Sequence, residues 1–310
     1  MKILITGGAG CLGTNLIERY MPQGHEICII DNFATGKKSV VSSIPNIKII
    51  EGNVSDKETV MNAFSNFRPE IVIHSAAAYK DPQNWEEDTK TNVLGSIYVS
   101  EASKTYAVDK IINFQTALCY GKPQEIPIPV NHPTGPFTSY GISKTAGEAY
   151  LLNSGLNVIS LRLANICAPR LAIGPIPTFY TRLKDGKSCF CSDTVRDFLD
   201  IEDFFELIDI ILTKEVPTGA YNVSTGKGNS ILDVFNVVRE YLGLDFIDVP
   251  IVPPGEDDVA KVVLDSSYSE EVLGWKAKKE FKEIIENQLK WYEAHGVNDI
   301  YSHLAIPTKS

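Results

Sequence analysis

The sequence predicts an α/β fold in which a doubly wound parallel sheet is followed by a smaller C-terminal α/β region. Two observations indicate this organisation. Apolar strand patterns alternate with helical patterns through the first half of the 310 residues, as in sheets whose parallel strands are joined by helices. Beyond Arg162, proline and glycine become frequent and the pattern is more irregular. We therefore expect one domain over residues 1–164 and a second region over residues 165–310, with some segments of the latter returning to the first sheet.

The expected elements of the first domain alternate at short, regular intervals. Strands are expected at residues 3–6, 26–31, 47–50, 70–74, 110–115 and 157–163, and helices at residues 11–21, 56–67, about 86–106 and 140–153. Ligands of such sheets bind beyond the carboxyl ends of the strands. Residues 7–13, 31, 53, 74–79 and 115–120 fall at those ends.

The first strand runs into a glycine-rich turn that suits a pyrophosphate. Gly7, Gly10 and Gly13 satisfy G-x-x-G-x-x-G, and together with Gly8 they also satisfy G-x-G-x-x-G. Such glycines let the backbone bend tightly and approach phosphates, while the following helix offers N–H groups and the positive end of its dipole. The alternative is a strand-to-helix turn that binds nothing. The context favours a dinucleotide-binding, Rossmann-type unit.

Asp31 ends the second strand, about 20 residues after the glycine turn. A carboxylate at this place accepts hydrogen bonds from the ribose hydroxyls of the adenosine and repels the 2′-phosphate of NADP. The sequence therefore predicts NAD as the cofactor. The alternative for Asp31 is an ordinary turn-forming residue at a strand end.

Composition and charge exclude several classes of protein. The formal net charge of −10 argues against a nucleic-acid partner, which calls for a basic face. No signal peptide and no apolar run long enough to span a membrane is visible, so we expect a cytoplasmic protein with no membrane partner. The six cysteines show no metal-binding spacing, so we expect reduced thiols and no metal.

Tyr140 and Lys144 form the pair that indicates hydride chemistry. They are four residues apart in a predicted helix, so their side chains lie one turn apart on the same face. A nearby ammonium and a cationic nicotinamide ring stabilise a phenolate and bring it toward working pH. Thr116, at the end of the fifth predicted strand, presents a hydroxyl toward the same crevice. The alternative is an ordinary amphipathic helix face.

With these motifs the chain resembles the extended short-chain dehydrogenase/reductases that act on nucleotide-diphosphate sugars, of which UDP-galactose 4-epimerase is the familiar member. The resemblance covers nearly the whole chain. Its motifs are the three glycines, Asp31-Asn32, Gly52-Asn53-Val54, His74-Ser75-Ala76-Ala77, Asn92-Val93-Leu94-Gly95, Thr116 with Tyr120-Gly121, Tyr140 with Lys144, Arg162-Leu163-Ala164-Asn165, Arg196-Asp197-Phe198, Tyr221-Asn222-Val223 and Gly226.

The resemblance implies roles for individual residues. Tyr140 would remove a proton from a sugar hydroxyl as hydride passes to the nicotinamide, and Thr116 would hydrogen-bond the same oxygen. Lys144 would hold the nicotinamide ribose and lower the tyrosine pKa. The residues implied to contact NAD are Gly7, Gly10, Cys11, Leu12, Gly13, Asp31, Asn32, Asn53, Val54, Ala76, Ala77, Tyr79, Asn92, Tyr140 and Lys144.

The C-terminal region would bind the sugar nucleotide. By the same resemblance, Asn165 would contact the diphosphate or the sugar, and Arg196 would pair with the diphosphate. Two alternatives stay open: Asn165 could be a strand-end turn residue, and Arg196 could be a surface partner of Asp193 or Asp197.

Several residues depart from the family pattern. Gln115, Thr116, Ala117 and Leu118 stand where many relatives have Ser-Ser or Asp-Glu, so the Asp-Glu pair of 4,6-dehydratases is absent, which disfavours simple dehydration. Tyr79 replaces a lysine of the epimerase, and Asn53 replaces a usual aspartate. Residues 253–257, Pro-Pro-Gly-Glu-Asp, lack the arginine common at this point, so the diphosphate would depend more on Arg196, with Arg170, Arg182 and Lys187 as further candidates.

The sequence thus predicts an NAD-dependent nucleotide-sugar 4-epimerase of carbohydrate biosynthesis. A nucleotide-sugar 4-dehydrogenase or ketoreductase would use the same three residues, and a non-catalytic NAD-sensing protein could share the fold. The family's common homodimer, built from helices near residues 86–106 and 140–153, is expected by analogy. Residues 305–310 lack pattern and are expected to form a tail.

Overall fold

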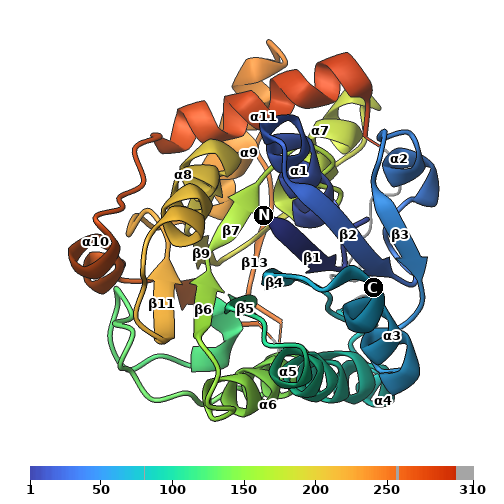
Figure 1. Ribbon diagram of the computed structural model, residues 1–310. Helices are drawn as coiled ribbons and strands as arrows, with labels where there is room; N and C mark the ends of the chain where they lie inside the picture. Colours follow the sequence, from blue (N-terminus) through green and yellow to red (C-terminus); the bar gives the residue numbers. More distant parts are fainter. Residues whose placement is uncertain (80, 256–257, 298–310) are drawn as a thin grey trace. The chain divides into compact units, whose positions relative to one another are not determined.

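The computed structural model describes residues 1–79, 81–255 and 258–297 (Figure 1). It divides into two compact units. The first unit comprises residues 1–121, 133–163 and 213–221. The second comprises residues 122–132, 164–212 and the described residues from 222 onward. The chain therefore crosses between the units several times, and residues 213–221 return to the first. The expected tail at residues 305–310 lies outside the described residues.

The first unit is built on a seven-stranded sheet with the order β11-β6-β5-β4-β1-β2-β3. Adjacent strands from β3 to β6 pair in parallel, which confirms the doubly wound, Rossmann-type prediction. The strands are β1 (Lys2–Thr6), β2 (Glu26–Asp31), β3 (Lys48–Glu51), β4 (Ile71–His74), β5 (Lys110–Thr116), β6 (Val158–Leu163) and β11 (Gly219–Val223).

Helices connect these strands close to the predicted positions. They are α1 (Cys11–Tyr20), the short η1 (Met21–Gln23), α2 (Lys38–Ser42), α3 (Lys57–Phe67), α4 (Trp85–Asp88), α5 (Gly95–Thr105), η3 (Ala117–Tyr120) and α6 (Ser139–Leu152). Between α4 and α5 the helical run passes through a π-helical segment, η2 (Thr89–Leu94). One long helix was expected here. The inserted π-turn re-aims the side chains of the run, and such turns are frequent at functional sites.

The core of the first unit lies between the sheet and the helices α3, α5 and α6. Leu4, Val72 and Ile111 of the sheet are packed in one cluster with Phe64 of α3 and Val99 of α5. Strand β1 is apolar at consecutive positions and nearly inaccessible to solvent, as expected of a central parallel strand covered on both faces. This packing fixes the carboxyl ends of β1, β2, β4 and β5 at one edge of the sheet.

In its described residues the second unit has five helices and several short strands. The helices are α7 (Pro175–Lys184), α8 (Ile201–Thr213), α9 (Ile231–Tyr241), α10 (Ser267–Leu273) and α11 (Phe281–His295). The strands form three small sheets, which are β7 (Asn165–Cys167) with β10 (Phe198–Asp200), β9 (Val195–Arg196) between β12 (Asn229–Ser230) and β14 (Lys261–Val262), and β8 (Cys191–Ser192) with β13 (Ile251–Val252).

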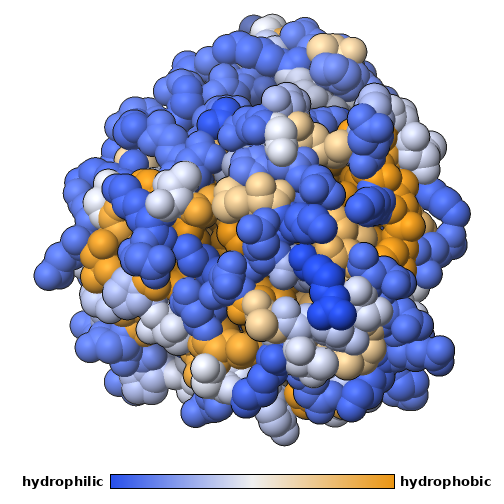
Figure 2. Space-filling view, in the orientation of Figure 1, coloured by the Kyte–Doolittle hydropathy of each residue, from blue (hydrophilic) through white to orange (hydrophobic). Residues whose placement is uncertain are grey.

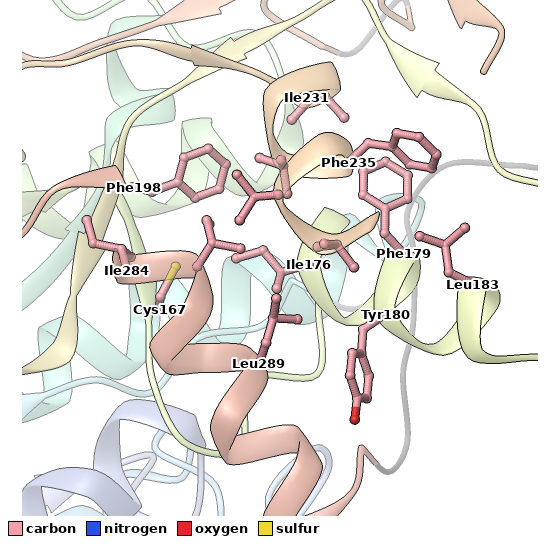
Figure 3. Close-up of a cluster of buried hydrophobic side chains, with 14 of the residues drawn as sticks. Cys167, Ile176, Phe179, Tyr180, Leu183, Phe198, Ile231, Phe235, Ile284 and Leu289 are labelled. Atoms are coloured by element: carbon pink, nitrogen blue, oxygen red, sulfur yellow. The ribbon is translucent and has the colours of Figure 1, made fainter. Parts of the chain in front are cut away.

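Aromatic and aliphatic side chains from α7, α9 and α11 form the core of the second unit (Figure 3). Phe179 and Phe235 meet edge to face, with their ring centroids 5.3 Å apart. Ile284 and Leu289 of α11 close the cluster from a third helix. Cys167 of β7 and Phe198 of β10 belong to this cluster, so the strand that begins at Asn165 is anchored to it.

The surface is predominantly hydrophilic on the face drawn in Figure 2, with apolar side chains in patches between the polar ones. In the part of the chain that the structure describes, no helix has the length and apolar character needed to cross a membrane.

Candidate active site

The glycine turn after β1 is tightly packed against the neighbouring backbone. Gly7 has φ +68°, and a Cβ there would lie 2.8 Å from the backbone of Ala76. At Gly13 a Cβ would lie 2.5 Å from the backbone oxygen of Gly7. Helix α1 begins after Gly10, and among the described residues no side chain caps it. Its first N–H groups lack intrahelical partners, which suits an anion such as a pyrophosphate.

Asp31 holds the glycine turn to the end of β2. Its Oδ2 accepts from the N–H of Ala9 at 2.8 Å, and its Oδ1 accepts from the N–H of Phe33 at 2.7 Å. Only 8% of the residue is exposed, and burial raises the pKa of its carboxyl. Each carboxylate oxygen can accept more than one hydrogen bond. The carboxylate can thus accept from ribose hydroxyls as well, and neighbouring Asn32 is exposed beside it.

Two amides secure the segments that the resemblance assigns to the cofactor. Asn53, beside buried Val54, accepts from the N–H of Ser55 at 2.9 Å and donates to Glu87. Asn92 donates to the oxygen of Ala78 at 3.1 Å and to Ser143 Oγ at 3.0 Å. Its Oδ1 accepts from the N–H of Ala78. Asn92 therefore ties the segment that contains Ala76, Ala77 and Tyr79 to helix α6.

Thr116 lies at the last position of β5 and is half-buried. Its Oγ1 accepts from the N–H of Leu118 at 3.2 Å, which starts the turn η3. A hydroxyl that accepts one hydrogen bond can still donate its proton to another oxygen. The first turn of α6 lies close by, since a Cβ at Gly141 would come within 3.1 Å of the Leu118 oxygen.

Tyr140 occupies the first turn of α6, next to the N-cap Thr138, whose hydroxyl accepts from the N–H of Gly141. The ring of Tyr79 packs beside it, with centroids 6.1 Å apart. Burial raises the pKa of the Tyr140 phenol above its ordinary value, and Tyr79 and Asp88 raise it further.

Lys144 is buried one turn beyond Tyr140 and points to the backbone of β5. Its Nζ donates to the oxygen of Phe114 at 2.6 Å. Burial lowers the pKa of Lys144 to about 8, and the nearby Glu148 opposes that shift. The role of Lys144 in lowering the tyrosine pKa stays a prediction for the cofactor-bound protein. The ammonium is held by Phe114, and burial dominates at the phenol.

A buried ion pair lies behind Lys144 and was not predicted. Arg162 of β6 forms three hydrogen bonds with the carboxylate of Glu148, the shortest at 2.9 Å, and a fourth with the Tyr120 hydroxyl at 2.9 Å. Ser160 Oγ also donates to Glu148 at 2.7 Å. One signal in the sequence could have drawn attention to Glu148: it lies four residues after Lys144, which puts both side chains on one helix face. Arg162 had been noted only as part of a family motif.

Gln115, notable in the sequence only as a departure from the family pattern, makes contacts that were not predicted. Only 2% of it is exposed, although it lies beside Thr116 at the end of β5. Its Nε2 donates to the backbone oxygen of Lys144 at 2.9 Å, and its Oε1 accepts from the N–H of Thr116 at 2.7 Å. No sequence pattern predicts the bond to Lys144, which is 29 positions away.

In the second unit, Asn165 and Arg196 lie on adjoining strand ends. Asn165 is exposed at the start of β7, and its Nδ2 donates to the oxygen of Asp197 at 3.0 Å. Arg196 is paired with Asp258, and its Nη1 donates to the oxygen of Val195. The side chain of Arg196 is only 15% exposed.

Asp193 and Asp197 were the alternative partners for Arg196, whereas the structure pairs it with Asp258. Asp197 instead accepts from Thr225 and Gly226, and its burial raises the pKa of its carboxyl to about 6. Of the further candidate cations, Arg182 donates to the oxygen of Ser188, and Lys187 pairs with Asp185 at 2.7 Å. Glu256 and Asp257 lie outside the described residues.

Comparison with known proteins gives concordant results. The family model described as "NAD dependent epimerase/dehydratase family" matches residues 3–224. The crystal structure of the Bordetella bronchiseptica enzyme WbmG in complex with NAD and UDP is 59% identical, covers 98% of this chain and 99% of that chain, and has a TM-score of 0.94. WbmH from the same organism, in complex with NAD⁺, is 36% identical with a TM-score of 0.89 and covers 96% and 99%. A UDP-glucose 4-epimerase of Lacticaseibacillus casei is 26% identical over 95% of this chain and 98% of its own length.

Proposed function

The chain belongs to the NAD-dependent epimerase/dehydratase family, and from that premise we propose that it is a 4-epimerase of a UDP-linked sugar. Three kinds of relationship support the proposal: the family match, the NAD and UDP bound by WbmG, and relatives named as UDP-glucose 4-epimerases. The observation that carries it is the packing of α6 against the end of β5, which brings the turn of Tyr140 and Lys144 to the strand end that bears Thr116.

In this proposal Tyr140 takes the proton from the sugar C4 hydroxyl. It returns the proton after the opposite face of the sugar has turned toward the cofactor. Thr116 donates its hydroxyl proton to the same oxygen and fixes its position. Lys144 contributes a buried ammonium beside the cofactor ribose. When bound, NAD supplies the hydride acceptor for C4 and a positive charge close to the phenol. That charge opposes the burial that raises the pKa of Tyr140.

NAD is the cofactor of this family, and residues of the first unit would hold it. The N-terminus of α1 would face the pyrophosphate, and Asp31 would accept from the adenosine ribose. The remaining contacts assigned from the sequence stay predictions. The UDP diphosphate would be bound by Arg196, with Asn165 donating from the neighbouring strand.

Simple 4,6-dehydration is not proposed, because buried Ala117 and half-buried Leu118 offer no acid or base at the required positions. Net oxidation or ketoreduction remains the second candidate and uses the same three residues.

We also propose a homodimer and a cytoplasmic location. Two large apolar side chains of α6, Ile142 and Tyr150, are 51% and 55% exposed and lie two turns apart on the helix. The six cysteines, all in the described part of the chain, form no disulfide, which supports a reducing compartment. A monomer in gel filtration at micromolar concentration would contradict the dimer.

A substrate panel tests the proposed activity. The protein would be incubated with UDP-, GDP- and CDP-sugars while the sugar products and NADH absorbance are followed. We expect a new C4 epimer of a UDP-sugar with no net change in NADH. Accumulation of NADH together with a released keto sugar would favour the dehydrogenase. Absence of turnover despite NAD binding would contradict both enzymatic proposals.

A further inference from the structure

The carboxyl end of β5 extends beyond the neighbouring strand β4. The register pairs His74, the last residue of β4, with Asn113, and β5 continues through Phe114, Gln115 and Thr116. In this overhang two backbone groups of β5 are bonded by side chains. The oxygen of Phe114 accepts from Lys144, and the N–H of Thr116 donates to Gln115.

The amide of Gln115 is bonded at both ends across two elements. Its Oε1 holds the N–H of Thr116 at 2.7 Å, and its Nε2 holds the backbone oxygen of Lys144 at 2.9 Å. We propose that Gln115 is a positioning residue that sets where the Thr116 hydroxyl stands relative to the helix turn of Tyr140 and Lys144. The inference rests on the proposed function of these three residues.

Burial protects the two hydrogen bonds of Gln115 from competition by water. Gln115 is 2% exposed, so a lost hydrogen bond cannot be replaced freely by water. Because the Thr116 hydroxyl also accepts from Leu118, a rotation of the Thr116 peptide would displace that hydroxyl and the following turn together. Asparagine is one methylene shorter than glutamine and could not span both partners in this geometry.

Two substitutions distinguish the contributions of the two Gln115 hydrogen bonds. Gln115→Met keeps the length and removes both hydrogen bonds, whereas Gln115→Glu keeps the acceptor for Thr116 and removes the donor to Lys144. A misplacement of ~1 Å at a reacting group costs roughly 10²-fold in rate. We therefore expect Gln115→Met to lower kcat by about 10- to 100-fold, with the Kd for NAD and the KM for the UDP-sugar changed by less than about threefold.

A double-mutant cycle distinguishes positioning from general support. If Gln115 acts through Thr116, its replacement in a Thr116→Val background should lower kcat by only a few-fold more. Full additivity of the two losses would overturn the inference, because a purely structural contribution does not depend on the threonine hydroxyl.

Hydrogen exchange provides a readout that does not require turnover. Peptides that contain the Thr116 amide should exchange faster in Gln115→Met than in the wild type. The matched control is Asn113→Leu, which removes another buried amide from the same strand, one that donates to Ser160 at 2.9 Å. That control should leave both kcat and the exchange of Thr116 close to wild type.

The outcomes separate this inference from the proposed function. If the wild type epimerises a sugar and Gln115→Met retains full kcat, the positioning inference is wrong while the function stands. If the wild type turns over no sugar nucleotide, the proposed function fails, and unchanged exchange at Thr116 in Gln115→Met overturns the inference as well. Should Gln115→Met fail to fold, the same measurements on Gln115→Leu, which also removes both hydrogen bonds, decide the matter.

Discussion

The ammonium of Lys144 lies 2.6 Å from the backbone oxygen of Phe114. Lys144, which is predicted to bind the cofactor ribose, thus also forms a hydrogen bond with β5 in the part of that strand that extends beyond β4. Since only 5% of the residue is exposed, the positive charge is held in a poorly solvated place. Its pKa is lowered to about 8 for that reason.

We expect the stability conferred by Lys144 to rise at alkaline pH. Below about pH 8 the lysine is charged in both the folded and the unfolded state, and the folded state bears the full cost of burial. Between about pH 8 and ~10.4 the unfolded state binds more protons, so stability rises with pH. The free energy of unfolding of the wild type relative to Lys144→Met should increase by up to ~3 kcal/mol across that range. Urea denaturation of cofactor-free protein measures it, and a pH-independent difference would contradict it.

Breaking the buried ion pair behind Lys144 should destabilise the fold strongly. The side chains of Arg162 and Glu148 are 10% and 3% exposed, so Glu148→Gln leaves a buried guanidinium without its counter-charge. We expect a loss of ~3–5 kcal/mol in the free energy of unfolding. The exposed pair Lys38–Glu51 is the control, and Glu51→Gln should cost less than ~1 kcal/mol. Equal effects of the two substitutions would show that burial of the first pair is unimportant.

Local sequence patterns predicted the parts of the site that lie within one element or turn. The glycine turn, the end of β2 and the Tyr140–Lys144 helix face each depend on neighbouring residues, so their places could be read from spacing. The bonds of Gln115 and Arg162 could not, because they join residues 29 and 14 positions apart through side chains whose direction depends on the packed sheet. The pairing of Arg196 with Asp258 spans 62 positions and was missed for the same reason.

Asp31 shows how burial modifies a sequence-based expectation. A strand-end carboxylate that met only ribose hydroxyls would, when replaced, weaken NAD binding more than folding. In the structure the carboxylate also holds the N–H groups of Ala9 and Phe33, so Asp31→Ala should lower the free energy of unfolding by ~1–3 kcal/mol as well. NAD affinity should fall by a comparable free energy. Calorimetric NAD titration and urea denaturation measure the two effects, and unchanged NAD affinity or a wild-type preference for NADP would refute the ribose assignment.

Arg196→Met should raise the KM for the UDP-sugar far more than it lowers kcat. The diphosphate is remote from the reacting carbon and is held alike in the ground and transition states. Asp258 is a useful contrast because its carboxylate partly neutralises the guanidinium. Asp258→Asn should therefore lower the KM several-fold. Steady-state kinetics and UDP binding test both changes, and full UDP affinity in Arg196→Met would mean that another cation holds the diphosphate.

Tyr140→Phe should leave folding and NAD binding nearly unchanged and lower kcat by ~10²–10⁴-fold, the usual contribution of a positioned proton-transfer group. Only the phenol oxygen is removed, so packing beside Tyr79 is kept. Tyr150→Phe, on the exposed side of the same helix, is the matched control and should retain wild-type kcat. Lys144 would act partly by stabilising the phenolate once NAD is bound, and that part is lost when the phenol is absent. The losses from Tyr140→Phe and Lys144→Ala should therefore be less than additive in the double variant. A Tyr140→Phe protein with near-normal turnover of its UDP-sugar would refute the assignment, and the tyrosine would then be a packing residue of α6.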